Sequence, residues 1–363
     1  TFEEKGLYEL YVSAKKNRIV FTSEYQKTDI YIVAVATPYD RNTFKVDASY
    51  VCKAVRDIIQ VCTKNAIIII ESTVTPGTID KYIKPIITEY NYTIGVDIHL
   101  VHAPERIIPG NMIFELENNS RTIGSESGEI GEKVKKIYES FCKGKIVLTD
   151  IRTAEFTKVV ENTYRAVNIA FANELAKICR YTGLDVYEVI KICNMHPRVN
   201  ILTPGPGVGG HCISVDPWFL VGEYPKLTNV ISEALKVNMS MPEYVLERIN
   251  EIMDEKGITD TSRIGLYGLT YKENVDDYRD SPSLQLINYQ KKHLAKPLKS
   301  YDPNVKKIIV ENQYLDFDRF LEDIDFIVIL VGHDHIKQNI DRIAGKTIFD
   351  TKKISDLPGT YRL

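Results

Sequence analysis

The stretch DIYIVAVATP, residues 29–38, is a nearly unbroken apolar run that ends in a Thr-Pro turn. Such a run is typical of a strand buried on both faces in a parallel sheet. Asp47 is placed to cap a following helix, whose apolar residues recur at helical spacing: Val51, Ala54, Val55, Ile58 and Ile59. Two further apolar runs, AIIIIESTVTPGT (66–78) and DIHLVHAPERIIPG (97–110), each break into a polar turn. Repeated strand–helix units of this kind predict a Rossmann-like α/β domain over residues 1–150.

Polar residues follow each predicted strand at a corresponding place: Thr37–Pro38, Glu71–Thr73 and Glu105–Arg106. Ligands of open α/β sheets bind beyond the carboxyl ends of the strands. We therefore expect a binding site at this edge of the sheet.

The start of a dinucleotide-binding sheet is not found before residue 29. Such a sheet opens with a strand, a Gly-x-Gly-x-x-Gly turn and a helix, and an acidic residue ends its second strand. Either the domain does not bind a dinucleotide, or this chain, whose first residue is not Met, lacks the first βαβ unit. The absence of that unit would leave an unprotected sheet edge.

The middle of the chain is predicted to be helical over 151–257. Residues 153–183 run without an internal Gly or Pro and stop at Gly183, so they predict one helix roughly 45 Å long that bridges two domains. Alternating strand and helix patterns return over 258–363 and predict a second Rossmann-like domain. Its expected strands lie in 262–272, 297–303, 325–333 and 346–353, and Ser281–Pro282 opens a helix between the first two.

Composition excludes several classes of partner. The net charge of −3 does not indicate a surface that binds a nucleic acid or an anionic membrane. The apolar runs are too short to cross a bilayer. The six cysteines are scattered without metal-ligand or disulfide spacing, so we expect no metal site, free thiols and a cytoplasmic protein.

Cys212 is the candidate nucleophile, within GPGVGGHCISVDP (205–217). A loop rich in backbone N–H groups stabilises a thiolate, and glycines let a substrate approach the main chain. The alternative is a buried structural cysteine, which is our interpretation of the other five. We expect a Gly- and Pro-rich loop to pack poorly, which weakens that alternative for Cys212. Asp216 adds a carboxylate that could order a water molecule. A phosphate-loop interpretation fails because no strand precedes the glycines and no Lys-Ser/Thr follows them.

Lys158, Asn162 and Arg165 recur at i, i+4 and i+7 and share one stripe of the long helix. Its other residues are largely apolar, including Val160 and Phe171, so we expect the helix to be buried on most sides. A solvated polar face is the alternative. Burial of a Lys or Arg without a functional role would cost free energy of folding, so a functional stripe is favoured.

The motifs ESTVTPGT, HAPERIIPG, KVVENTYRAVNIAFANELAKIC, HPRVNI, GPGVGGHCISVDPWF and GLTYKENVDDYRDSP together resemble the UDP-glucose/GDP-mannose dehydrogenase family over nearly the whole chain. The resemblance implies an NAD-dependent, four-electron oxidation of a UDP-sugar C6 alcohol to a carboxylate, and a homodimer or larger assembly. Cys212 would carry a thiohemiacetal and then a thioester. Lys158 and Asn162 would stabilise charge or move protons, and Asp216 and Glu105 would order the hydrolytic water.

The resemblance also implies binding residues. Substrate contacts would come from Arg106, Ile107, Arg165, His196, Arg198, Gly209, Tyr271 and Lys272, with Arg198 reaching the site of a neighbouring subunit. Cofactor contacts would come from Thr37, Thr73 and Arg279. Val215 stands where UDP-glucose enzymes of the family usually carry Lys, which favours an N-acetylated sugar.

The expected substrate is UDP-N-acetyl-D-mannosamine, and UDP-N-acetylglucosamine and UDP-glucose are the alternatives within the class. Outside the class, the alternatives are a non-catalytic nucleotide-sugar binding protein and a two-electron hydroxyacid dehydrogenase. The first would be expected to lose a member of the set Cys212, Lys158, Asn162 and Asp216, and all four are present. The second would need no nucleophilic thiol.

Overall fold

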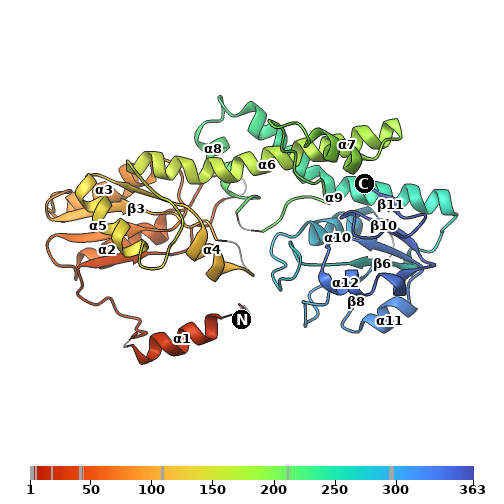
Figure 1. Ribbon diagram of the computed structural model, residues 1–363, viewed down its shortest axis with the longest axis horizontal. Coiled ribbons are helices and arrows are strands. Elements are labelled where there is room, and N and C mark those ends of the chain that lie inside the picture. The colour runs from red at the N-terminus through yellow and green to blue at the C-terminus, as the bar shows by residue number, and fades with distance from the viewer. Residues whose placement is uncertain are drawn as a thin grey trace. The chain divides into compact units, whose positions relative to one another are not determined.

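The structure is a computed structural model that describes residues 4, 6–17, 19–40, 43, 45–107, 110–210, 212–293 and 298–363. Contacts divide the chain into two compact units. The first unit comprises Thr1–Glu161 with Trp218–Thr228, and the second comprises Asn162–Pro217 with Asn229–Leu363. Each unit contains one twisted sheet with helices on both faces (Figure 1). The α/β class and the two Rossmann-like sheets predicted from the sequence are confirmed.

The first sheet has five strands in the order β1-β2-β3-β4-β5, and β4 runs antiparallel to β3. Its strands are β1 (Ile30–Val33), β2 (Ala66–Ile70), β3 (Ile98–His102), β4 (Arg121–Ser125) and β5 (Ile146–Thr149). Its helices are α1 (Leu7–Lys16), α2 (Ser49–Ile59), η1 (Ile79–Ile83), α3 (Lys84–Glu89), α4 (Met112–Asn118) and α5 (Gly128–Tyr138). Helices α2, η1 and α3 pack on one face and α5 packs on the other. All five residues of β2 are buried, as expected for a central strand covered on both faces.

Two details of this sheet differ from the sequence predictions. Strand β1 pairs with β2 alone among the described strands, and Ile32 is 52% exposed, so burial on both faces was wrong for this run. An edge strand has one open side, which a periodicity argument does not detect. The N-cap of α2 is Ala48 rather than Asp47, although the Asp47 carboxylate accepts the Ser49 N–H (2.9 Å).

The second sheet has six parallel strands in the order β11-β10-β9-β6-β7-β8. They are β6 (Ile264–Tyr267), β7 (Lys299–Tyr301), β8 (Gln313–Tyr314), β9 (Phe326–Ile329), β10 (Thr347–Asp350) and β11 (Tyr361–Arg362). The remaining elements of this unit are α7 (Val186–Cys193), α9 (Asn229–Lys256), η2 (Thr261–Arg263), α10 (Pro282–His293), α11 (Phe317–Glu322), α12 (Asp334–Gln338) and η3 (Ile340–Ile343). Helices α9 and α10 cover one face, and α11 and α12 cover the other.

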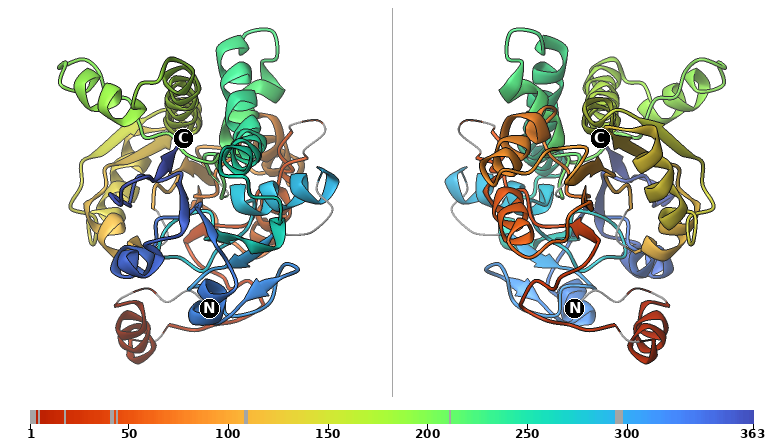
Figure 2. Two further views of the ribbon diagram at one scale, coloured as in Figure 1. Left: turned by 90° about the vertical axis from the view of Figure 1, so that its right-hand side faces the viewer. Right: turned by 90° about the vertical axis from the view of Figure 1, so that its left-hand side faces the viewer.

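Two helices belong to both units, namely α6 (Ile151–Thr182) and α8 (Asp216–Glu223). The single long helix predicted over 153–183 is therefore present, and Gly183 ends it with a left-handed φ of 74°. In the second unit α6 lies beside α9 (Figure 2), joined by a buried hydrogen bond from Asn173 Nδ2 to Asn238 Oδ1 (2.9 Å).

The expectation that α6 is buried on most sides was wrong for one face of the helix. Val159 and Ala170 are buried, but Val160 is 39% exposed and Phe171 is 50% exposed. These exposed side chains belong to a long apolar stripe that the described residues leave uncovered. No described helix is long and apolar enough to cross a membrane.

Candidate active site

The carboxyl ends of β1, β2 and β3 surround a cavity of about 310 Å³ in the first unit. It is lined by Ala34, Val35, Glu71, Ser72, Glu105, Ile107 and Leu116. Ser72 ties two of the strand ends together, because its hydroxyl donates to the Val35 carbonyl (2.7 Å). The cavity lies where parallel α/β sheets bind ligands, and two predicted site residues, Glu105 and Ile107, line it. Thr37 and Thr73 are half-buried in the turns that follow β1 and β2.

Glu105 is held through both carboxylate oxygens. Its Oε1 accepts the backbone N–H of Arg106 (2.5 Å), and its Oε2 pairs with Arg121 Nη2. Arg121 is 4% exposed and also donates to Glu71 Oε1 (3.1 Å). Burial raises the pKa of Glu71 and Glu105 adds to this effect, whereas Arg121 opposes it. The cavity thus contains two carboxyl groups that share one buried guanidinium.

The Arg106 side chain is engaged within the first unit. Its guanidinium forms a bidentate pair with Glu161 of α6 (2.7 Å for both contacts) and donates to Thr122 Oγ1 and the Ser120 carbonyl (2.9 Å each). These contacts tie the loop after β3 to β4 and α6. Substrate binding by Arg106 stays a prediction, and it would require some of these bonds to be exchanged.

Lys158 and Asn162 are one turn apart on α6 and both are buried, at 8% and 6% exposure, whereas Arg165 is exposed. Asn162 Nδ2 donates to Asp216 Oδ2 (2.6 Å), and Asp216 is 4% exposed. A buried carboxylate requires such a partner, since an unpaired one loses its hydration without compensation. Two residues 54 positions apart in sequence, both predicted to be catalytic, are therefore in direct contact.

Cys212 is exposed, four residues before Asp216, in a turn where the Asp216 N–H donates to the Cys212 carbonyl (2.8 Å). All six cysteines are described as thiols without a disulfide. The turn leads directly into α8, so the thiol lies at the start of a helix and on the surface of its unit. Exposure distinguishes Cys212 from Cys142 and Cys179, which are buried.

The glycine loop before Cys212 is well packed, contrary to the expectation from its composition. Pro204, Gly205 and Pro206 are buried, and Gly210, with a φ of 81°, lies against the Tyr271 ring. A Cβ at Gly209 would lie 2.6 Å from the Asp280 carbonyl oxygen. These glycines therefore allow close packing on the segment that carries Tyr271. Burial raises the pKa of the Tyr271 phenol.

The remaining predicted residues of the second unit lie in two loops. Lys272 is half-buried beside Tyr271, and Arg279 pairs with Asp277 through Nε and Nη2 (2.9 and 2.6 Å). His196 and Arg198 are both exposed, and the Arg198 N–H donates to His196 Nδ1 (3.3 Å).

Sequence reasoning missed several residues that hold these parts in place. Arg121 belongs to no motif, and only the pairing of β4 with β3 brings it to the strand ends. Asp302 accepts the N–H groups of Leu269 and Thr270 (2.6 and 3.0 Å), which fixes the turn before Tyr271. The carboxylate of Asp302 is buried, and the bonds from His333 and the backbone lower its pKa despite that burial. The Tyr-Asp-Pro turn after a predicted strand was the available signal.

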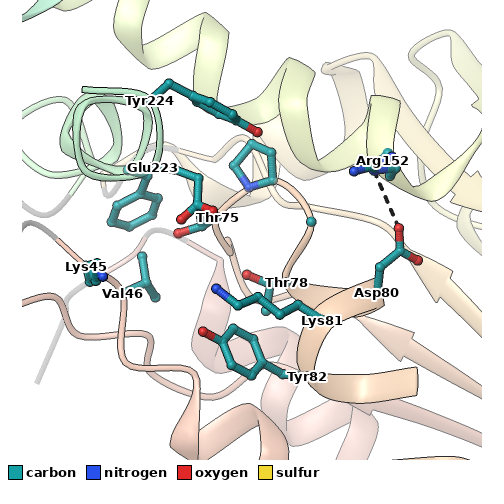
Figure 3. Close-up of a pocket in the computed structure, with 13 residues that line it drawn as sticks. Lys45, Val46, Thr75, Thr78, Asp80, Lys81, Tyr82, Arg152, Glu223 and Tyr224 are labelled. Atoms are coloured by element: carbon teal, nitrogen blue, oxygen red, sulfur yellow. Dashed lines mark ion pairs between the residues drawn. The ribbon is translucent and has the colours of Figure 1, made fainter. Parts of the chain in front are cut away.

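A second cavity of the first unit, about 350 Å³, contains none of the predicted site residues (Figure 3). Lys81 and Tyr82 reach it from η1, Glu223 is the last residue of α8, and Tyr224 directly follows that helix. Arg152, paired with Asp80 (3.4 Å), reaches the cavity from α6. Its rim carries charges of both signs.

Glu155 of α6 is fully buried below the Pro76–Thr78 turn of this cavity. Its carboxylate accepts the N–H groups of Gly77 (2.6 Å) and Ile79 (3.0 Å), which caps the start of η1. Burial nevertheless raises the pKa of Glu155 to about 7. The first turns of α6 are thereby joined to the segment that follows Thr73.

We expect the Glu155→Gln protein to lose part of its pH-dependent stability. The unfolded Glu155 titrates near 4.5 and the folded one at about 7, so folding takes up a proton between these pH values. The stabilisation is complete below pH 4.5 and is lost as the pH rises to about 7, a change of ~3 kcal/mol at 1.36 kcal/mol per unit. Urea unfolding at pH 5 and pH 8 should show a smaller difference for the variant. The exposed Glu132→Gln is the control, and equal differences in all three proteins would contradict the assignment.

The comparisons with known proteins agree with this arrangement. The NAD-binding, central and UDP-binding domains of the UDP-glucose/GDP-mannose dehydrogenase family match residues 1–142, 152–240 and 265–357. The chain belongs to this family.

Three relatives within the family are named for N-acetylated sugars. The chain is similar to a UDP-N-acetyl-D-mannosamine dehydrogenase of Methanocaldococcus jannaschii, at 42% identity over 91% of this chain and 76% of the relative. The solved UDP-N-acetyl-mannosamine dehydrogenase of Staphylococcus aureus is 38% identical, with a TM-score of 0.87 over 100% of this chain and 87% of that one. An NDP-N-acetyl-D-galactosaminuronic acid dehydrogenase of Ralstonia nicotianae is 36% identical over 91% of this chain and 80% of its own length.

The residues at the ends of β1 to β3 fit the cofactor of this family. The lining of the cavity there includes the aliphatic side chains of Val35 and Ile107 and the carboxyl groups of Glu71 and Glu105. Thr37 and Thr73, in the adjoining turns, would contact NAD. The family's NAD-binding domain confirms the cofactor predicted from the sequence.

Proposed function

We propose that this protein oxidises the C6 alcohol of UDP-N-acetyl-D-mannosamine to the carboxylate, with the transfer of four electrons. The observation that carries the proposal is the buried Asn162–Asp216 hydrogen bond, which holds a carboxylate four residues from the exposed Cys212 thiol. A thiol beside a fixed carboxylate suits covalent capture of an aldehyde followed by hydrolysis.

In this mechanism the Cys212 thiolate adds to the C6 aldehyde and forms a thiohemiacetal, whose oxidation gives a thioester. Thr37, Thr73 and Arg279 would hold NAD, which would supply the electron acceptor for each oxidation. Lys158 stabilises negative charge on the C6 oxygen or exchanges its proton, and Asn162 orients the neighbouring Asp216. Water then hydrolyses the thioester with the help of Asp216 and Glu105, which releases the uronate and regenerates the thiolate.

We assign substrate contacts to the residues implied by the family: Arg106, Ile107, Arg165, His196, Arg198, Gly209, Tyr271 and Lys272. Thr37, Thr73 and Arg279 would contact NAD. The names of the relatives support an N-acetylated hexosamine, and Val215 supports it from the sequence.

The test is the stoichiometry of NADH on a panel of UDP-sugars. We expect two NADH for each UDP-N-acetyl-D-mannosamine consumed, and at least ~10-fold lower kcat/KM for UDP-glucose, which corresponds to ~1.4 kcal/mol of discrimination. The N-acetylglucosamine and N-acetylgalactosamine nucleotides complete the panel. Equal kcat/KM for UDP-glucose would contradict the sugar assignment, and one NADH per sugar would contradict the four-electron mechanism.

We also propose that two copies of the chain associate through α6. Four of its apolar side chains recur along one face and are exposed by 50–93%: Tyr164, Phe171, Ile178 and Tyr181. Their spacing of seven, seven and three residues is that of a helix seam that packs on another helix. Sedimentation equilibrium should give a dimer at about 1 µM, and Phe171→Glu should weaken it. A monomeric parent protein would contradict the proposal.

The cytoplasm is the compartment we propose, because six reduced cysteines suit a reducing environment. The uronate would serve the synthesis of a surface polysaccharide or glycan.

A further inference from the structure

Arg121 is a buried cation whose two ion pairs are both with carboxylates that line the cavity of the first unit. It is the first residue of β4, and its guanidinium bonds to Glu105 from the end of β3 and to Glu71 from the end of β2. Its side chain is 5% exposed, whereas those of the two glutamates are 24% and 19% exposed. The carboxylates thus face the cavity and the guanidinium lies behind them.

Aromatic rings fix the guanidinium in this place. Arg121 Cζ lies 4.5 Å from the centre of the Tyr138 ring and 5.8 Å from that of Phe141. The Tyr138 hydroxyl donates to Glu71 Oε1 (3.2 Å), the oxygen that also accepts from Arg121. A guanidinium stacked on rings and bonded at its edges is rigid, and it holds its two carboxylates in fixed directions.

The charges of this cluster explain why one arginine is needed. Two carboxylates that line one small cavity repel each other, and a cation bonded to both reduces that repulsion. Burial is the largest influence on Glu71 and disfavours its charged form. Loss of Arg121 would leave both carboxyl groups without their shared cation, and Glu105 would keep only the Arg106 N–H at Oε1.

We propose that Arg121 is a positioning residue for the hydrolytic half of the reaction, which fixes the Glu105 carboxylate and directs it into the cavity. The proposal rests on the proposed function. In the step concerned, the oxygen of a water molecule bonds to the acyl carbon of the Cys212 thioester and one water proton passes to Glu105. The carbon–sulfur bond breaks, and its electron pair leaves with the sulfur as the Cys212 thiolate. The two oxidations that precede this step do not require Glu105 as a base.

The experiment compares the first turnover with the steady state in Arg121→Met. We expect a first-turnover burst of two NADH per active site at a rate within about threefold of the parent. The steady-state rate should then be ~10²-fold lower, the lower end of what a positioned general base contributes. Acid quench and mass spectrometry should find the uronyl group as a thioester on Cys212.

Arg248→Met is the matched control. Arg248 is also 4% exposed and paired with two glutamates, Glu251 and Glu255, but it lies in the second unit. It reports the cost of removing a buried arginine from a unit that does not contain the cavity, and it should leave the steady-state rate within about threefold of the parent. If Arg121→Met fails to fold, Arg121→Lys replaces it in the experiment. Lysine keeps the positive charge but lacks the planar guanidinium whose N–H groups bond to two carboxylates. We expect it to slow the steady state ~10-fold with the burst retained.

Two results would overturn the proposal while the proposed function stands. One is a steady-state rate of either Arg121 variant within threefold of the parent. The other is an equal slowing of burst and steady state with no thioester, which would mean that Arg121 only supports the fold. If neither the parent nor the variant carries a thioester during turnover, the proposed function itself is wrong, and this inference falls with it.

Discussion

Replacement of Cys212 by alanine is expected to lower the rate of uronate formation by at least ~10³-fold, because covalent capture of the aldehyde is lost. Binding of the UDP-sugar should change less than about threefold, since a thiol contributes little to recognition of a nucleotide. Steady-state NADH formation and isothermal titration of the sugar nucleotide measure the two effects separately.

Cys193→Ala is the control for the Cys212 variant. Cys193 is a partly exposed thiol at the end of α7 in the same unit, and its loss should leave the rate unchanged. Uronate formation by Cys212→Ala at the parental rate would exclude the thioester mechanism. Loss of sugar-nucleotide binding together with activity would instead show that the loop, and not the sulfur, had been damaged.

Replacement of Lys158 by methionine should lower kcat by ~10²–10³-fold and change KM for the sugar by only a few-fold. Lys158 is buried, and methionine keeps most of its apolar stem while it removes the amine. General acid–base work or oxyanion stabilisation by one group contributes rates of this order.

Lys177→Met provides the comparison on the same helix. Lys177 is half-buried, and its amine donates to Ser240 Oγ (3.0 Å) within the second unit. Its loss should cost stability but little activity. A similar fall in kcat for both variants would mean that the effect comes from packing of α6 rather than from the Lys158 amine.

The fold was largely predictable from periodicity. The run at 66–70, the bridging helix and the four strand segments after residue 261 were placed correctly, because long periodic segments report which face is buried. Strand β1 was predicted too long and too deeply buried, because the pattern of one segment does not show whether it lies at an edge. The exposed stripe of α6 was missed because an exposed apolar face and a core face have the same apolar periodicity in the sequence.

The candidate site was predictable only in part. Helical spacing placed Lys158 and Asn162 on one stripe, and the glycine-rich context singled out Cys212. The sequence did not predict the contact of Asn162 with Asp216, in which Nδ2 and Oδ2 lie 2.6 Å apart. The packing of the glycine loop was predicted wrongly, because neighbours such as Asp280 and Tyr271 come from 60 or more residues away.

The sequence by itself determined the order of strands and helices and the presence of the reactive residue types, because these depend on local spacing and composition. Only the tertiary structure decided which polar groups meet. Arg121 pairs with Glu105 and Glu71, the Glu155 carboxylate accepts the N–H groups of Gly77 and Ile79, and Asn162 donates to Asp216. Electrostatic pairing depends on distances of a few ångströms between segments far apart in the chain, and strand order and helix packing set those distances.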